Sequence, residues 1–190
     1  MLQIDIPVER RREFPKKQEF SCRRKMNPIT HYELWNSAEA ERMSDFLILM
    51  AEDDSDDRFL MEKATKELAI RAGFRFVEDG EELMLYLRRS EKYADPSFSP
   101  RPALIIMDLN MPKKDGRQAL IEIKTDPDLR KIPVVIWTTS GEREDKILCR
   151  TAGADDFVTK PTDYTQLVNS VRKLLTRYSI RGSVVVSGDS

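Results

Sequence analysis

From residue 46 onward, short apolar runs alternate with stretches in which apolar residues recur every three or four positions. A continuous apolar run is typical of a strand buried on both faces, and the second pattern is typical of an amphipathic helix. The runs predict five strands, at residues 46–51, 74–77, 103–109, 134–138 and 156–159. Because helical stretches separate them, the chain is predicted to form an α/β fold with a parallel sheet covered on both faces.

Five helices are expected between and after these strands. The first begins at Asp54 or Ser55, carries Leu60, Ala64 and Leu68 on one face, and ends near Gly73. The second helix is expected over 81–89 and the third around 119–123. The fourth is expected over 142–152, with Ile147, Leu148 and Thr151 in one inward stripe. The last helix has apolar residues at positions 167, 168, 171, 174, 175 and 178.

The ends of the chain lack this pattern. Residues 1–44 carry nine Lys or Arg and seven Asp or Glu, interleaved, with no sustained apolar period. We therefore expect a flexible or weakly helical arm over 1–44, one folded domain over 45–179 and a short tail over 180–190.

Composition narrows the class of protein. The formal net charge of −1 provides no basic field for nucleic acid. No apolar run approaches the roughly 18 residues of a membrane span, and the N-terminus lacks the apolar core of a signal peptide. Cys22 and Cys149 have neither redox nor metal-ligand spacing. These features predict a cytoplasmic protein with reduced thiols, bound to neither nucleic acid nor membrane.

Polar residues stand at the carboxyl ends of four of the predicted strands, where ligands of open parallel sheets bind. They are Glu52 and Asp53, Asp108 with Asn110, Thr138, and Lys160. Clustered carboxylates repel one another, and a hard divalent cation such as Mg²⁺ relieves that repulsion with oxygen ligands.

These groups suit phosphoryl chemistry. A carboxylate can act as a nucleophile and form an aspartyl phosphate, while Lys160 and the Thr138 hydroxyl contact phosphoryl oxygens. Taken singly, each residue has a simpler explanation: an acid after a strand is more often a helix cap or a solvated turn, and a Lys-Pro pair is usually a loop. Their joint occurrence at successive strand ends favours a metal–phosphate site.

Several motifs occur together and in order. They are Glu52-Asp53, Asp108-Leu109-Asn110-Met111-Pro112 followed by Asp115-Gly116, the segment 135–139, the segment 152–157, and Lys160-Pro161. On these motifs, residues 46–178 resemble the receiver domain of response regulators. The stretch Asp79-Gly80-Glu81-Glu82-Leu83, the long loop before the third strand and the segment 124–139 resemble single-domain regulators associated with bacterial phytochrome kinases.

The resemblance implies a flavodoxin-like (βα)5 fold, a doubly wound five-stranded sheet of order 2-1-3-4-5. It implies that Asp108 is the phosphoacceptor and that Mg²⁺ is held by the side chains of Asp53 and Asp108, by Glu52 through water and by the backbone carbonyl of Asn110. It further implies that Thr138 and Lys160 bind the phosphoryl group, that Phe157 is the aromatic residue that changes rotamer, and that the bond before Pro161 is cis.

The sequence departs from the family pattern at four places. Phe157 lacks a tyrosine hydroxyl, so switching there is expected to occur by packing. Glu52 replaces the commoner Asp. Asp54 extends the acidic pair to a triplet, so Asp53-Asp54 is an alternative pair, less favoured because the strand ends at Ala51. Thr139 is larger than the residue usual there, which puts access of the phosphoryl group in doubt.

The expected function is that of a non-enzymatic phosphoacceptor in a two-component phosphorelay. The expected partner is a sensor histidine kinase, such as a bacteriophytochrome, and a homodimer is expected through the fourth predicted helix, fifth strand and fifth helix. Only twelve residues follow Tyr178, so output by protein–protein contact is expected. The rivals are a pseudo-receiver adaptor that takes no phosphate and a dehalogenase-type phosphatase, which would need an acid at Asn110.

Overall fold

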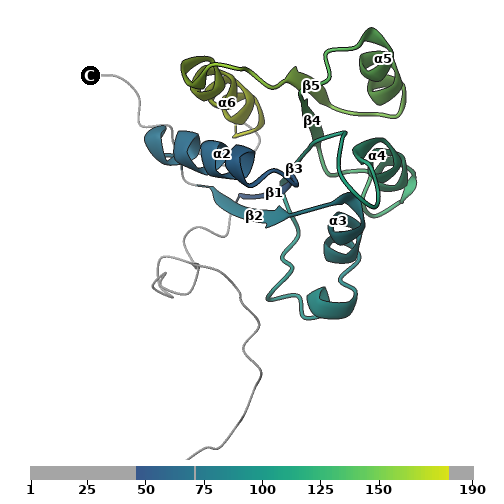
Figure 1. Cartoon of the computed structure of the whole chain (residues 1–190). Coiled ribbons are helices and arrows are strands. Elements are labelled where there is room, and N and C mark those ends of the chain that lie inside the picture. The colour runs from purple at the N-terminus through teal and green to yellow at the C-terminus, as the bar shows by residue number, and fades with distance from the viewer. Residues whose placement is uncertain (1–45, 71, 180–190) are drawn as a thin grey trace, which may run out of the picture. The chain divides into compact units, whose positions relative to one another are not determined.

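A computed structural model describes residues 46–70 and 72–179, and these residues form one five-stranded parallel sheet (Figure 1). The strands are β1 (Leu47–Ala51), β2 (Gly73–Val77), β3 (Leu104–Met107), β4 (Val134–Thr138) and β5 (Asp156–Thr159). Their order is β2-β1-β3-β4-β5, and every neighbouring pair is parallel. The predicted flavodoxin-like topology is confirmed. The predicted arm over 1–44 and tail over 180–190 lie outside the described residues.

Helices cover both faces of this sheet. They are α2 (Ser55–Glu67), α3 (Gly80–Leu87), α4 (Gly116–Thr125), α5 (Arg143–Thr151) and α6 (Tyr164–Ser179), with a short 3-10 helix, η1 (Glu91–Tyr93), before β3. In Figure 1, α2 and α6 lie together on one face, whereas α3, α4 and α5 lie on the other. Among the described residues, no helix is long and apolar enough to cross a membrane.

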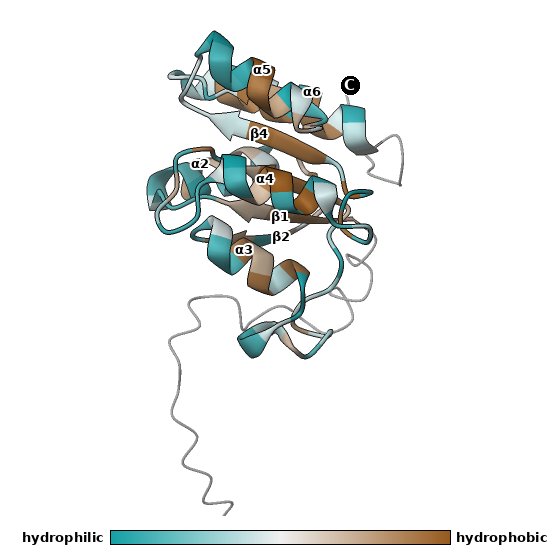
Figure 2. Ribbon diagram, turned by 90° about the vertical axis from the view of Figure 1, so that its right-hand side faces the viewer, coloured by the Kyte–Doolittle hydropathy of each residue, from teal (hydrophilic) through white to brown (hydrophobic). Residues whose placement is uncertain are grey.

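The sheet has a separate hydrophobic core on each face. Along β1, Leu49 and Ala51 pack toward α3 and α4, and Ile48 and Met50 pack toward α2 and α6. Successive side chains of a strand point to opposite faces, so a strand covered on both sides must be apolar throughout. Figure 2 shows hydrophobic colour over the first part of β4, and all five residues of this strand are buried.

Acidic residues cap four of the helices. The Asp54 carboxylate accepts hydrogen bonds from the backbone N–H groups of Asp56 and Asp57, and Asp79, Asp115 and Asp163 cap α3, α4 and α6 in the same way. Such caps satisfy N–H groups that have no partner within the helix. Asp54 is therefore occupied with helix capping.

Two predicted helix features are wrong. The first helix ends at Glu67 rather than near Gly73, because Ala69 adopts a left-handed φ of 49° that breaks the helix. In α5 the predicted inward stripe faces outward: Ile147 is 57% and Leu148 41% exposed, and Thr151 is also exposed. The buried positions of α5 are Asp145 and Cys149, because α4 supplies a cation that pairs with Asp145.

Candidate functional site

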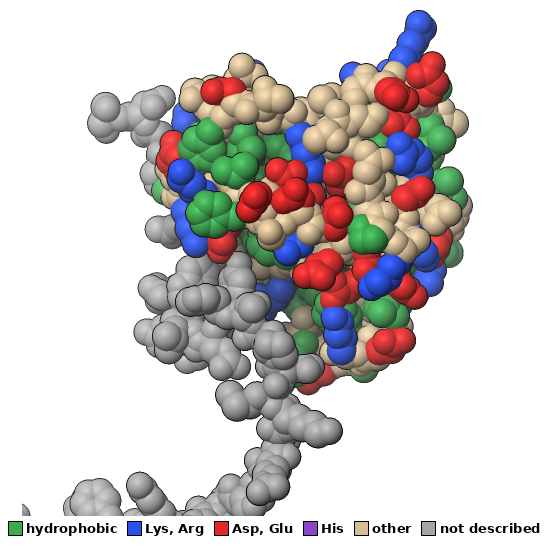
Figure 3. Space-filling model, viewed as in Figure 1, with side chains coloured by type: hydrophobic (Ala, Val, Ile, Leu, Met, Phe, Trp, Pro, Cys, Tyr) green, Lys and Arg blue, Asp and Glu red, His purple; other side chains and the backbone are tan. Residues whose placement is uncertain are grey.

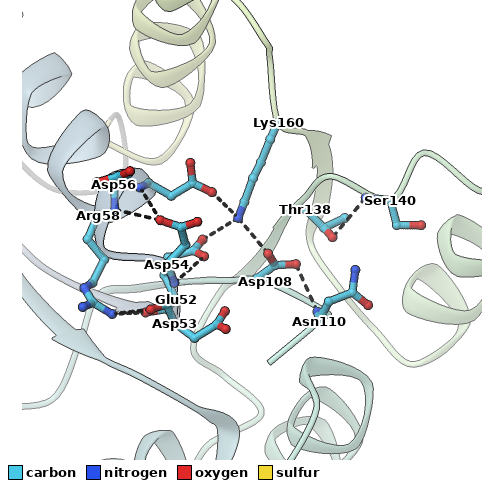
Figure 4. Close-up of polar contacts among 11 residues, drawn as sticks. Glu52, Asp53, Asp54, Asp56, Arg58, Asp108, Asn110, Thr138, Ser140 and Lys160 are labelled. Carbon is cyan, nitrogen blue, oxygen red and sulfur yellow. Dashed lines mark hydrogen bonds and ion pairs between the residues drawn. The ribbon is translucent and has the colours of Figure 1, made fainter. Parts of the chain in front are cut away.

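Lys160, which follows β5, lies among three carboxylates at the carboxyl ends of the strands. Its Nζ is 2.7 Å from Glu52 Oε2, from Asp57 Oδ2 and from Asp108 Oδ2. Figure 4 shows the lysine reaching down between Glu52 and Asp108. Acidic side chains also gather on the surface here, next to the first turn of α2 (Figure 3). Because three carboxylates surround one ammonium, the cluster carries an excess of negative charge.

Burial changes the acidity of this cluster. Removal of Glu52 from water raises the pKa of its carboxyl to about 7, and contact with Lys160 offsets only part of that increase. Burial alone would lower the pKa of the Lys160 ammonium, but the hydrogen bonds it donates to the surrounding carboxylates raise it above its usual range. The lysine is therefore a permanent positive charge.

Asp108 is held from two sides immediately after β3. Its Oδ1 accepts a hydrogen bond of 3.1 Å from the backbone N–H of Asn110, and its Oδ2 accepts one of 2.7 Å from Lys160. Its own backbone N–H donates to the carbonyl of Ala51 in β1. The side chain of Asp108 is only 7% exposed, so the carboxylate is oriented and largely shielded from water.

The loop around Asp108 is clamped by the segment that begins α3. The Gly80 N–H donates to the Lys114 carbonyl, and a Cβ at Gly80 would lie 2.5 Å from that oxygen. The Lys113 ammonium donates to the buried Asp79 carboxylate at 2.7 Å. The Asp79-Gly80 pair therefore fixes the position of Lys113 and Lys114, in the loop that follows Asp108, the candidate phosphoacceptor.

Thr138 is the last residue of β4 and is fully buried. Its Oγ1 accepts a hydrogen bond from the Ser140 N–H at 3.3 Å, and its carbonyl accepts one from the Lys160 N–H at 2.7 Å. Because Oγ1 acts here as an acceptor, its proton is available to a further acceptor.

The loop after Thr138 is tied to two helices. The Ser140 hydroxyl donates to Asp145 at 2.6 Å, and Arg117 of α4 donates two hydrogen bonds of 2.8 Å to the same carboxylate. These donors lower the pKa of Asp145 despite its burial. Phe157 of β5 is half-buried, with the Lys146 ammonium 5.6 Å from its ring centroid.

The remaining predicted residues lie nearby or differ from expectation. Asp53 and Asn110 are exposed, and the Asp53 carboxylate is not among the described groups that contact Lys160 (Figure 4). The predicted cis bond before Pro161 is wrong, since every peptide bond in the described ranges is trans. An X-Pro bond is trans unless its surroundings select cis, because trans is favoured by about 0.5–1 kcal/mol.

The fit of this site to a divalent cation can be judged from its oxygen donors. Within residues 46–70 and 72–179, no group of three or more acid, histidine or cysteine side chains has metal-ligand geometry. Glu52 Oε2 is nevertheless buried and accepts no hydrogen bond from the described residues, although Lys160 Nζ is close to it. A buried carboxylate oxygen without a hydrogen bond is an available ligand for water or for a hard cation. The residues present therefore fit a Mg²⁺-type ion.

Asp57 is the member of the cluster that sequence reasoning missed. The predicted site residues lie at the ends of strands, whereas Asp57 lies in the first turn of α2. An acid there is adequately explained by the helix dipole. The sequence feature that could have indicated Asp57 is its position three residues after Asp54, in the first turn of the helix that follows β1.

Comparison with known proteins agrees with this geometry. Residues 48–172 match the response regulator receiver domain family. The response regulator Rcp1 of Synechocystis is 38% identical over 126 residues, which cover 66% of this chain and 84% of Rcp1.

Two solved structures are similar over nearly their whole length. The phosphorylated cyanobacterial phytochrome response regulator RcpA is 34% identical with a TM-score of 0.68, covering 74% of this chain and 98% of RcpA. The Mn²⁺-bound form of Rcp1 is 35% identical with a TM-score of 0.64, covering 75% and 99%. With the family match spanning most of the chain, the protein belongs to the response regulator receiver domains, the phosphoacceptor signalling domains of two-component systems.

Proposed function

We propose that this chain accepts a phosphoryl group on Asp108 from the phosphohistidine of a sensor kinase and then signals by protein–protein contact. The observation that carries the proposal is the position of the Asp108 carboxylate, which is shielded from water and held between the Asn110 N–H and the Lys160 ammonium. A carboxylate fixed in this way is suited to nucleophilic attack.

In the proposed transfer, a carboxylate oxygen of Asp108 attacks phosphorus and forms a P–O bond. The P–N bond of the phosphohistidine breaks, and its electron pair returns to the imidazole nitrogen. The Lys160 ammonium, 2.7 Å from Asp108 Oδ2, neutralises charge that develops on the phosphoryl oxygens. The Thr138 hydroxyl, whose proton is available, donates to one of those oxygens once the group is attached.

Glu52, Asp53, Asp108 and the backbone carbonyl of Asn110 would hold Mg²⁺. The buried Glu52 Oε2, which accepts no hydrogen bond from the described residues, and the Mn²⁺-bound form of the relative Rcp1 support a divalent cation here. The ion would neutralise charge on the phosphoryl group during transfer. Without it, the excess negative charge of the site would repel a phosphodonor.

Signalling is proposed to shift an existing conformational equilibrium. Movement of Thr138 toward the phosphoryl group would alter the packing of Phe157 and so the face formed by α5, β5 and α6. That face carries the exposed side chains of Ile147 and Leu148. The relative RcpA is a cyanobacterial phytochrome response regulator, which points to a phytochrome kinase as donor, and a second copy of this chain could bind the same face.

Intact mass after incubation with phosphoramidate and Mg²⁺ tests the proposal. We expect one base-labile phosphoryl adduct, which disappears in Asp108→Asn and in the presence of a chelator. Asp128→Asn is the matched control, because Asp128 is an exposed aspartate away from the site. This variant should still form the adduct. A full adduct on Asp108→Asn would refute the assignment, and a wild-type chain that takes no phosphoryl group would favour a pseudo-receiver.

A further inference from the structure

We infer that Asp57 is a positioning residue, which holds the Lys160 ammonium while Asp108 is unphosphorylated and releases it when a phosphoryl group is attached. The inference rests on the proposed function. Its basis is the 2.7 Å contact between Lys160 Nζ and Asp57 Oδ2, which joins the loop after β5 to the first turn of α2.

The carboxylates around Lys160 compete with a phosphoryl group for its ammonium. An ammonium has three N–H donors and no acceptor. In this site three carboxylates, one each from Glu52, Asp57 and Asp108, lie 2.7 Å from Nζ. Nζ donates hydrogen bonds to Asp57 and Asp108, and the Glu52 oxygen lies at ion-pair distance. Movement of Nζ toward a phosphoryl oxygen on Asp108 therefore weakens its contacts with the other two carboxylates.

Exposure identifies which contact is given up. The side chain of Asp57 is 31% exposed, against 1% for Glu52 and 7% for Asp108. A carboxylate that returns to water recovers its hydration, whereas a buried one loses its counter-charge without compensation. Asp57 is therefore the partner whose loss costs least.

The first turn of α2 presents Asp57 from a fixed position. The Asp54 carboxylate caps this turn, and the Arg58 guanidinium donates to the carbonyls of Glu52 and Asp53 at 2.6 and 3.1 Å. The turn is thus fastened to the end of β1, next to the candidate metal ligands. Release of Lys160 is then a movement of the lysine side chain rather than of the helix.

Beryllium fluoride, a phosphoryl analogue, can measure this competition. All variants carry Trp35→Phe, so that fluorescence reports only on Trp137, the residue before Thr138. The chain is titrated at saturating Mg²⁺. Because Asp57→Asn weakens a contact made only before phosphorylation, we expect it to tighten beryllium fluoride binding by about two- to fivefold, the range for a partly exposed ion pair.

Asp56→Asn is the matched control. Asp56 is the preceding residue, is exposed, and is not among the carboxylates around Lys160. Asp56→Asn makes the same change of charge but removes no contact with Lys160. It should therefore alter the affinity for beryllium fluoride by less than about twofold. Equal effects of the two variants, or weaker binding by Asp57→Asn, would overturn the inference. In those cases the wild type still binds the analogue, so the proposed function survives.

Urea unfolding without divalent cations tests the holding contact separately. In a double-mutant cycle, Asp57→Asn and Lys160→Met should together cost less stability than the sum of their separate effects. Strict additivity would show that the contact does not hold Lys160. A wild-type chain that binds no beryllium fluoride would overturn the proposed function and the release step together.

Discussion

Gly116 begins α4 directly against the backbone of Asp108. A Cβ at Gly116 would lie 2.0 Å from the Asp108 carbonyl oxygen, 2.9 Å from Leu109 Cα and 3.0 Å from the Asp108 carbonyl carbon. Its N–H also donates to the Leu109 carbonyl at 2.9 Å. All these neighbours are backbone atoms, so no side-chain rotation can relieve the contact in Gly116→Ala.

The size of the effect follows from these distances. Ordinary contact at a Cβ begins at 3.4 Å, so α4 would have to move about 1.4 Å from the end of β3. Overpacking costs about 1–3 kcal/mol, and two backbone segments belong at the upper end of that range. Replacement of a glycine by alanine within a helix raises the free energy of unfolding by about 0.5–1 kcal/mol. We therefore expect Gly116→Ala to lower the free energy of unfolding by about 2 kcal/mol.

Urea unfolding measures this change, and Gly141→Ala is the control. A Cβ at Gly141 meets only Thr159 side-chain atoms at 4.0 Å, so its effect should stay within about 0.5 kcal/mol. Because the shift occurs at Asp108, Gly116→Ala should also slow formation of the phosphoryl adduct. Equal unfolding free energies for the two variants, at equal m-values, would refute the reasoning.

Three further outcomes are expected. The pKa of Glu52 in the folded protein is about 7, above its usual 4.5. Its contribution to the free energy of unfolding is therefore full below pH 4.5 and is lost as pH rises through 7. Urea unfolding without divalent cations should show this decline in the wild type and not in Glu52→Gln. The pKa of Asp145 is lowered, so its contribution is present at neutral pH and is lost as pH falls below its usual 3.8. In the same assay at pH 7, Asp145→Asn should cost about 1–3 kcal/mol, whereas Glu144→Gln, exposed on the same helix, should cost little. Burial raises the pKa of the Cys149 thiol to about 11. In a Cys22→Ser variant, which keeps only Cys149, a thiol reagent at about pH 8 should react only after unfolding. Labelling of the folded variant would contradict this.

Where burial alone determines a pattern, the sequence was sufficient. β4 has the predicted bounds because it is covered on both faces and buried throughout. The edge strand β5 also has the predicted bounds, although it is only partly buried. All six apolar positions predicted for α6 are buried, because that helix packs one continuous stripe against the sheet. The strand order came from the resemblance, since periodicity does not identify the neighbours of a strand.

The two main failures have one physical cause. In α5, the predicted stripe placed Ile147 inward, yet the helix buries Asp145 because Arg117, 28 residues earlier, neutralises it. At the site, nothing in the sequence singled out Asp57, yet it contacts Lys160, 103 residues later.

An apolar residue carries its preference for burial with it, so its position in an element can be predicted locally. A charged residue is buried only where an opposite charge meets it, and that partner is set by the tertiary fold. Helix patterns therefore assign charges to the solvent by default, and they fail at the paired carboxylates that tie the elements of a receiver domain together. In this chain, Asp145 connects α5 to α4 and to the loop after Thr138, and Asp57 connects α2 to Lys160. The two charges to which the sequence assigned no role are those that join the proposed phosphorylation site to the surrounding helices.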